Sequence, residues 1–273
     1  MSRSYDCADD TRRKEGVSDA ASAVRRGELV VLPTDTVYGI GADAFSPGAV
    51  NGLLTAKGRG RDMPPPVLVG SVRAAQALVE DFGRHGRDLI DEFWPGPLTV
   101  VCAATPSLSW DLGDTKGTVA VRMPLQPVAL DLLREVGPMA VSSANVSGRP
   151  AATTADAAAE QLGESVSVYL DGGPCDSDIP STIVDLTYAV PRLLRAGTIP
   201  IERLRQVCGT VLGEPKRRAS GTADDAESPG EADEPGEGRA DAEETTDPAS
   251  GEVSAGGAGP EESAGNPGTP SRE

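Results

Sequence analysis

Short apolar runs alternate along the chain with segments in which apolar residues recur at helical spacing. Runs of the first kind are typical of buried strands, and segments of the second kind are typical of helices packed on a sheet. The pattern predicts strands at 28–32, 67–69, 98–103, 118–122, 139–141, 166–171, 182–185 and 192–195. It predicts helices at 17–26, 49–57, 74–82, 86–93, 127–136, 155–162 and 200–208.

This alternation predicts an α/β fold with helices on both faces of one sheet. Residues 35–41 are rich in turn formers, and we expect a connection there. Residues 1–14 are polar, and we expect a flexible N-terminal arm. The remaining stretch, 15–213, has the length of a single domain with one large core.

The last segment, 214–273, differs in composition from the rest. It contains no Leu, Ile, Phe, Tyr, Trp or Met, and it is built mainly of Gly, Pro, Ala, Ser, Thr, Asp and Glu. Such a sequence cannot bury enough apolar surface to offset the entropy lost on ordering, so we predict a disordered tail. The tail has 16 acidic and 5 basic side chains, which accounts for −11 of the net charge of −17. This charge argues against a tail that grips RNA or an anionic membrane.

The spacing of the cysteines and the length of the apolar runs indicate the cellular compartment of the protein. Cys7, Cys102, Cys175 and Cys208 are scattered and show no metal-like spacing, as expected in a reducing cytosol. Residues 1–15 lack the apolar stretch of a signal peptide, and no run is long enough to span a membrane. We therefore expect a cytoplasmic protein without membrane contact.

Four polar clusters lie at the ends of predicted strands or beside a helix. In open α/β sheets, ligands commonly bind outside the carboxyl ends of the strands. They are 33–39 with Thr36, 57–61 with three cations, 142–149, and 180–185 with 194–197. Glycines between Lys57, Arg59 and Arg61 suit a phosphate group, although the spacing is not that of a Walker A loop. Each cluster could also be an ordinary capping turn or a solvated surface loop.

Several kinds of catalysis find no support in the sequence. The only histidine, His85, lies in an exposed-looking stretch, and no paired carboxylates or metal-binding pattern appear. The composition of the clusters favours chemistry by positioning and charge neutralisation, as in phosphoryl or nucleotidyl transfer.

Six segments together resemble the YrdC-like family. Their order and spacing follow the family pattern over roughly residues 15–200. The segments are 33–41 (PTDTVYGIG), 57–59 (KGR), 93–99 (FWPGPLT), 119–124 (VAVRMP), 143–148 (SANVSG) and 181–185 (STIVD).

The resemblance implies a twisted mixed sheet flanked by helices around a positively lined cleft. It also implies synthesis of threonylcarbamoyl-AMP from L-threonine, bicarbonate and ATP. By resemblance, threonine would be held by Thr36, Arg122, Ser143 and Ser181. Lys57 and Arg59 would be the catalytic residues at the ATP phosphates. The nucleotide would be lined by Arg59, Met63, Thr118, Val141, Asn145, Ser147, Arg149 and Arg195.

The resemblance further implies that Mg²⁺ arrives with ATP, that the protein binds no metal of its own and no tight cofactor, and that the product passes to a tRNA threonylcarbamoyl transferase complex. Met63 and Leu68 depart from the family pattern, which carries Asn and, in some members, His at these positions. One alternative is a module that binds RNA through phosphate contacts. Another is a carbamoyl-transfer domain of hydrogenase maturation, although its usual zinc-binding cysteines are missing. A purely structural role would leave the four clusters unexplained.

Overall fold

The computed structural model describes residues 1–213, and the predicted disordered tail at 214–273 lies outside the described residues. The strands form one ten-stranded mixed sheet in the order β1-β8-β2-β3-β7-β4-β6-β5-β9-β10. They are β1 (Arg3–Asp6), β2 (Val30–Leu32), β3 (Gly39–Asp43), β4 (Val67–Leu68), β5 (Leu98–Ala103), β6 (Thr118–Arg122), β7 (Met139–Ser143), β8 (Val168–Asp171), β9 (Thr182–Asp185) and β10 (Arg192–Arg195). The helices are α1 (Asp10–Arg25), α2 (Pro47–Lys57), α3 (Val72–Leu78), α4 (Gly83–Phe93), α5 (Pro127–Val136), α6 (Ala155–Leu162) and α7 (Ile201–Cys208), with a 3₁₀ turn at Gly163–Ser165.

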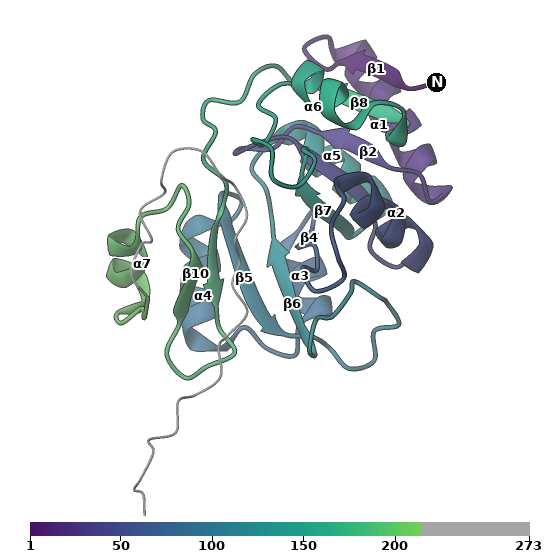
Figure 1. The fold of residues 1–273 in the computed structure, drawn as a ribbon. Helices are drawn as coiled ribbons and strands as arrows, with labels where there is room; N and C mark the ends of the chain where they lie inside the picture. Colours follow the sequence, from purple (N-terminus) through teal and green to yellow (C-terminus); the bar gives the residue numbers. More distant parts are fainter. Residues whose placement is uncertain (214–273) are drawn as a thin grey trace, which may run out of the picture. The chain divides into compact units, whose positions relative to one another are not determined.

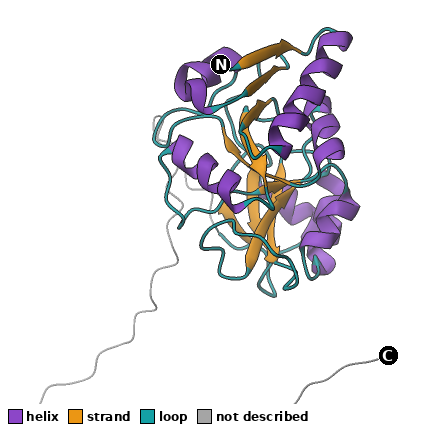
Figure 2. Ribbon diagram, turned by 90° about the vertical axis from the view of Figure 1, so that its right-hand side faces the viewer, coloured by secondary structure: helices purple, strands orange, loops and turns teal. Residues whose placement is uncertain are grey.

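Helices lie on both sides of the strands (Figure 2). Successive residues of a strand face opposite sides, so Leu32 packs in one apolar cluster with α1 and α5, while Val31 packs in another with α2 and α6. A third cluster joins α3, α4 and α7 to β5, β6 and β9. Figure 1 shows the sheet twisting, with β8 and β2 running across the direction of β5 and β6. The predicted α/β fold with both faces covered is confirmed.

The predicted flexible arm at residues 1–14 is wrong. β1 pairs in parallel with β8, with Arg3 opposite Val168, and α1 already begins at Asp10. Asp9 caps this helix by accepting a hydrogen bond from the backbone N–H of Arg12. The sequence did not reveal β1 because the strand lies at the sheet edge and its residues are polar and mostly exposed, so no alternating pattern marks it.

The predicted connection at 35–41 ends in a strand that the apolar pattern missed. β3 pairs antiparallel with both β2 and β7, and Gly39 lies opposite Leu32 and Ser143. Its glycines leave space for neighbouring side chains, since a Cβ on Gly39 would lie 2.6 Å from Cγ1 of Val141. Glycine is depleted in strands, so sequence reasoning assigned the segment to a turn.

Other differences concern the ends of elements. The third predicted helix stops at Leu78 instead of residue 82, and β7 runs to Ser143. Within the described residues, no helix combines the length and the apolar character needed to cross a membrane.

Candidate active site

The turn between β2 and β3 contains a chain of hydroxyl groups. Thr34 Oγ1 donates to the carbonyl of Val37 at 2.6 Å and accepts from the backbone N–H of Thr36 at 3.2 Å. Because this uses the hydroxyl hydrogen of Thr34, Thr36 is the donor in the 3.0 Å contact between the two hydroxyls. Both threonines are buried, so the predicted residue Thr36 has a fixed side chain whose oxygen can accept further hydrogen bonds.

Arg122, at the end of β6, contacts this turn with its guanidinium. Nη1 donates to Thr36 Oγ1 at 3.0 Å, and Nη2 donates to Asp35 Oδ1 at 2.8 Å. Only 5% of Arg122 is exposed. Burial lowers the pKa of Arg122, and the neighbouring carboxylate of Asp35 opposes that shift. Arginine stays charged under such conditions, so the site holds a buried cation.

The turn after α4 supports Arg122 from the other side. The carbonyl of Gly96 accepts from Arg122 Nε at 3.0 Å, and the Gly96 N–H donates to the carbonyl of Met123 at 2.8 Å. Trp94 anchors the turn through a 2.7 Å hydrogen bond from Nε1 to the carbonyl of Leu98. A Cβ on Gly96 would lie 2.4 Å from the carbonyl oxygen of Phe93, so this position requires glycine. The WPGPLT segment therefore positions Arg122.

Ser181 and Arg195 form a second pair. Arg195 Nη2 donates to the Ser181 carbonyl at 2.9 Å and to Ser181 Oγ at 3.0 Å. Thr99 Oγ1 lies 2.9 Å from the same Oγ. Gly197 allows the close approach, because a Cβ there would lie 2.4 Å from the Ser181 carbonyl carbon. The two predicted residues, Ser181 and Arg195, are thus brought together, and Ser181 is buried.

The loop after β7 is held by the end of α2. Lys57 Nζ donates to the carbonyl of Ser143 at 2.6 Å, to the carbonyl of Asn145 at 2.8 Å and to Asn145 Oδ1 at 3.2 Å. The Lys57 carbonyl accepts from the N–H of Ser147 at 2.9 Å. Asn145 is fully buried, and its Nδ2 donates to the carbonyl of Arg149 at 2.8 Å. The structure therefore brings together the predicted residues of the SANVSG segment and Lys57.

Ser147 differs from its neighbours in this loop. Its Oγ is buried and has no hydrogen-bond partner. A buried hydroxyl without a partner is destabilising, and a bound ligand could supply the missing contact.

The remaining predicted nucleotide residues differ in their surroundings. Arg59 Nη1 donates to Ser142 Oγ at 3.3 Å, which ties the KGR segment to β7. Thr118 is half-buried, and its hydroxyl donates to the carbonyl of Thr115 at 2.8 Å. Val141 packs in the core cluster with Leu32, so its backbone is the part that could line a ligand. Met63 is half-buried in the loop before β4, and Arg149 is exposed.

These groups do not meet at the carboxyl ends of parallel strands, contrary to our expectation. β4 is parallel to β6 but antiparallel to β7, so Arg122 and Ser143 end strands that run in opposite directions. The turn at 33–38 joins them instead, since it is bonded to Arg122 through Thr36 and accepts from the N–H of Ala144 at the Tyr38 carbonyl. The N–H of Thr182 donates to the carbonyl of Pro97, which brings the Ser181 pair beside the WPGPLT segment.

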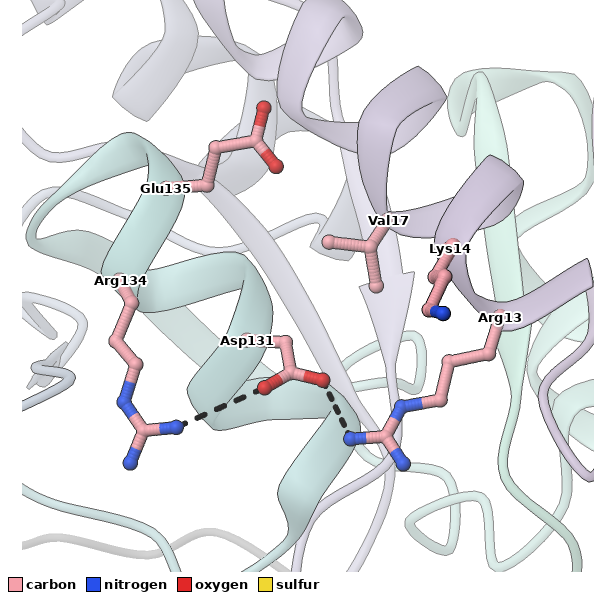
Figure 3. A pocket seen from close by; sticks show the side chains of 6 residues that line it. All are labelled: Arg13, Lys14, Val17, Asp131, Arg134 and Glu135. Atoms are coloured by element: carbon pink, nitrogen blue, oxygen red, sulfur yellow. Dashed lines mark hydrogen bonds and ion pairs between the residues drawn. The ribbon is translucent and has the colours of Figure 1, made fainter. Parts of the chain in front are cut away.

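A separate hollow of about 420 Å³ lies between α1 and α5. Asp131 reaches Arg13 on one side and Arg134 on the other, the latter at 3.6 Å (Figure 3). None of the predicted site residues lines this hollow. Three basic side chains and two carboxylates line the hollow, and we assign it no part in the candidate site.

Sequence reasoning assigned no role to Asp35, Thr99 or Gly96, although each contacts a predicted residue. The signal was available, because all three lie inside the quoted segments 33–41 and 93–99. Within the described residues, no group of three or more His, Cys, Asp and Glu side chains is arranged to hold a metal ion.

Comparison with known proteins gives consistent matches. The Sua5_yciO_yrdC family model, described as "Telomere recombination", matches residues 22–197. A Mycobacterium tuberculosis protein named "Putative threonylcarbamoyl-AMP synthase" is 57% identical over 209 residues, which cover 77% of this chain and 96% of that protein. A Bacillus subtilis "Threonylcarbamoyl-AMP synthase" is 38% identical over 71% of this chain and 57% of its own length, so the match spans little more than half of that relative.

Solved structures give the same picture. The structure of Pyrococcus abyssi Sua5 complexed with L-threonine matches with a TM-score of 0.71 and 34% identity, over 78% of this chain and 62% of that one. Escherichia coli YciO matches with a TM-score of 0.66 and 20% identity, over 75% of this chain and all of that one. The second likeness concerns the fold alone.

Proposed function

Because this chain belongs to the Sua5_yciO_yrdC family, we propose that it is a threonylcarbamoyl-AMP synthase, a nucleotidyltransferase that acts in tRNA modification. It joins L-threonine, bicarbonate or CO₂, and ATP into threonylcarbamoyl-AMP and pyrophosphate. The observation that carries this proposal is the 57% identity to a mycobacterial protein of that name over 96% of its length. The buried cluster around Arg122 supports it, since it offers a cation and hydroxyls to a small amino acid.

The proposed threonine site consists of Thr36, Arg122, Ser143 and Ser181. A guanidinium has more N–H donors than the three contacts that Arg122 makes, so it can also bind the substrate's carboxylate or hydroxyl. The hydroxyl groups of Ser143 and Ser181 would add hydrogen bonds to the threonine substrate. Ser181 is held in place by Arg195 and Thr99, so its side chain is preorganised for a ligand.

The proposed nucleotide site consists of Arg59, Met63, Thr118, Val141, Asn145, Ser147, Arg149 and Arg195. Ser147 is the member with the most direct support, because its buried Oγ lacks a partner. Arg59 is the proposed phosphate contact, since it lies beside the loop after β7 through Ser142. The ammonium of Lys57, the other predicted catalytic group, is surrounded by carbonyls instead.

The proposed reaction has two steps. The threonine amine displaces water from bicarbonate and forms a carbamate. A carbamate oxygen then attacks the α-phosphorus of ATP, and the bond to the β-phosphate breaks as pyrophosphate leaves. This chain's residues would act by holding the two reactants together and by stabilising negative charge with Arg59 and Arg122, without a covalent enzyme intermediate.

The other partners are also proposals. Mg²⁺ would arrive with ATP and be bound mainly by phosphate oxygens, as is usual for this ion. We further propose that the protein works in the cytoplasm and passes its product to a tRNA threonylcarbamoyl transferase complex.

The test is pyrophosphate release by the purified full-length chain with ATP, bicarbonate and each amino acid in turn. The proposal predicts release that needs both bicarbonate and L-threonine. Release with another amino acid would contradict the substrate assignment. No release with any amino acid, together with RNA binding that weakens steeply with salt, would instead favour a binding module.

A further inference from the structure

Lys57 is a lysine in an unusual environment. It lies on the buried side of α2 with Leu53 and Leu54, and none of its surface is exposed. Lysine is rarely buried to this extent, because removing its ammonium from water is unfavourable unless acceptors surround it. A fully buried ammonium therefore indicates a specific role in the site.

Three oxygen acceptors lie around the ammonium of Lys57. Two backbone carbonyls, of Ser143 and Asn145, and the side-chain oxygen of Asn145 lie within 3.2 Å. An ammonium has one N–H for each of these acceptors. In this arrangement, the group cannot also donate to a phosphate without giving up a contact to the loop.

The backbone of Lys57 holds the same loop at a further point. Its carbonyl accepts from the N–H of Ser147, so the residue grips the loop at both ends of the segment 143–147. α2 stops directly after Lys57, where Gly58 adopts a left-handed conformation with φ 61°. The chain turns there, and Arg59 reaches Ser142 separately.

We propose that Lys57 is a positioning residue that fixes the loop at 143–147 and does not itself contact the ATP phosphates. The idea rests on the proposed function, because this loop contains Ser143 from the proposed threonine site and Asn145 and Ser147 from the proposed nucleotide site. One buried ammonium thus sets the shape of both half-sites. Loss of the ammonium should weaken the binding of both threonine and ATP, whereas loss of a phosphate contact should weaken the binding of ATP alone.

The experiment compares Lys57→Met, Lys57→Arg and the control Lys14→Met with the unchanged protein. Lys14 is an exposed lysine on α1, so its substitution removes the same charge away from the site (Figure 3). Calorimetry measures L-threonine and ATP binding separately. Hydrogen exchange follows the backbone amides of residues 144–149, and its reading does not depend on activity.

We expect Lys57→Met to weaken both threonine and ATP binding about tenfold or more, with faster exchange at residues 144–149. Lys57→Arg should weaken both affinities as well, because the buried space between the acceptors of Ser143 and Asn145 is too small for the larger guanidinium. Lys14→Met should leave both affinities within about twofold. Retained ATP binding in Lys57→Arg, or loss of ATP binding alone in Lys57→Met with unchanged exchange, would overturn the proposal in favour of a phosphate contact.

If Lys57→Met does not fold, Lys57→Arg decides the question through the same two affinities. If the unchanged protein binds neither threonine nor ATP, the proposed function fails while the positioning role is still judged by exchange. Faster exchange at 144–149 in the Lys57 variants alone would then support it, and equal exchange in all proteins would overturn it.

Discussion

Arg122 and Thr36 are joined by a 3.0 Å hydrogen bond, although 86 residues separate them in the sequence. The Thr36 hydroxyl donates a hydrogen bond to Thr34 Oγ1, and the Thr34 hydroxyl donates to the carbonyl of Val37. The donors therefore run in one direction from the end of β6 into the turn between β2 and β3. A substitution at either end of this series of hydrogen bonds should therefore disturb the geometry at the other end.

Arg122→Lys tests how far this geometry matters. A lysine keeps the charge but cannot bond Gly96, Asp35 and Thr36 at once with a planar fork. We expect the free energy of unfolding to fall by about 1–3 kcal/mol and threonine affinity to fall about tenfold or more. Urea unfolding and calorimetry measure the two effects. Threonine affinity equal to that of the unchanged protein would remove Arg122 from the proposed threonine site.

Asp35→Asn tests the buried ion pair. The side chains of Arg122 and Asp35 are 7% and 12% exposed, and Asp35 Oδ1 also accepts from the N–H of Leu125. Removing the carboxylate charge leaves Arg122 buried without its ionic partner, so we expect a loss of about 3–5 kcal/mol in unfolding free energy.

The matched control for Asp35→Asn is Asp111→Asn. Asp111 pairs with Arg61 at 2.6 Å, but the side chains of Arg61 and Asp111 are 49% and 42% exposed. Solvent screens such pairs, so urea unfolding should show little change. Equal effects of the two substitutions would mean that burial does not strengthen the pair at Asp35.

Gly39→Ala tests the packing of β3. The added methyl would lie 2.6 Å from Cγ1 of Val141, whose β-branched side chain has little rotamer freedom. We expect a loss of about 1–3 kcal/mol in unfolding free energy. The same change at Gly52, within α2 and with nothing within 4 Å, should instead stabilise by roughly 0.5–1 kcal/mol. A Gly39→Ala protein as stable as Gly52→Ala would contradict the close packing of Gly39 against Val141.

The glycines of β3 also show why this strand could not be predicted from the sequence. Strands such as β5 and β6 were predicted because their apolar residues are bulky, whereas Gly39 and Gly41 leave no such trace. The opposite directions of β6 and β7 were not predictable either, because pairing direction depends on contacts between residues far apart in the sequence.

The site was predictable as a set of segments but not as a set of contacts. The link from Arg122 to Asp35 depends on a loop that crosses between distant strands. Lys57 was assigned to phosphate from its charge, yet it follows Leu53 and Leu54 at helical spacing, which already indicated the buried side of α2.

Cys102 gives a prediction for alkaline pH. Burial, with smaller contributions from Asp185 and Asp81, raises the pKa of its thiol from 9.0 to about 12. The unfolded chain therefore loses this proton first as pH rises. The associated stability is fully present below pH 9 and is lost between about 9 and 12, by up to about 1.4 kcal/mol per pH unit.

Urea unfolding at pH 8 and at about pH 10.5 measures this loss. Cys102→Val should lose less stability between the two conditions than the unchanged protein, because it has no thiol to ionise. Equal losses in the two proteins would show that the thiol does not ionise preferentially in the unfolded chain.

Synthesis of threonylcarbamoyl-AMP by this chain is tested most directly by the mass of its nucleotide product. The purified full-length protein is incubated with ATP, L-threonine and ¹³C-labelled bicarbonate, and the products are separated and weighed by mass spectrometry. We expect a threonine adduct of AMP that carries the label and that disappears when threonine or bicarbonate is omitted. Recovery of unchanged ATP alone, or of AMP and ADP without a labelled adduct, would contradict this expectation.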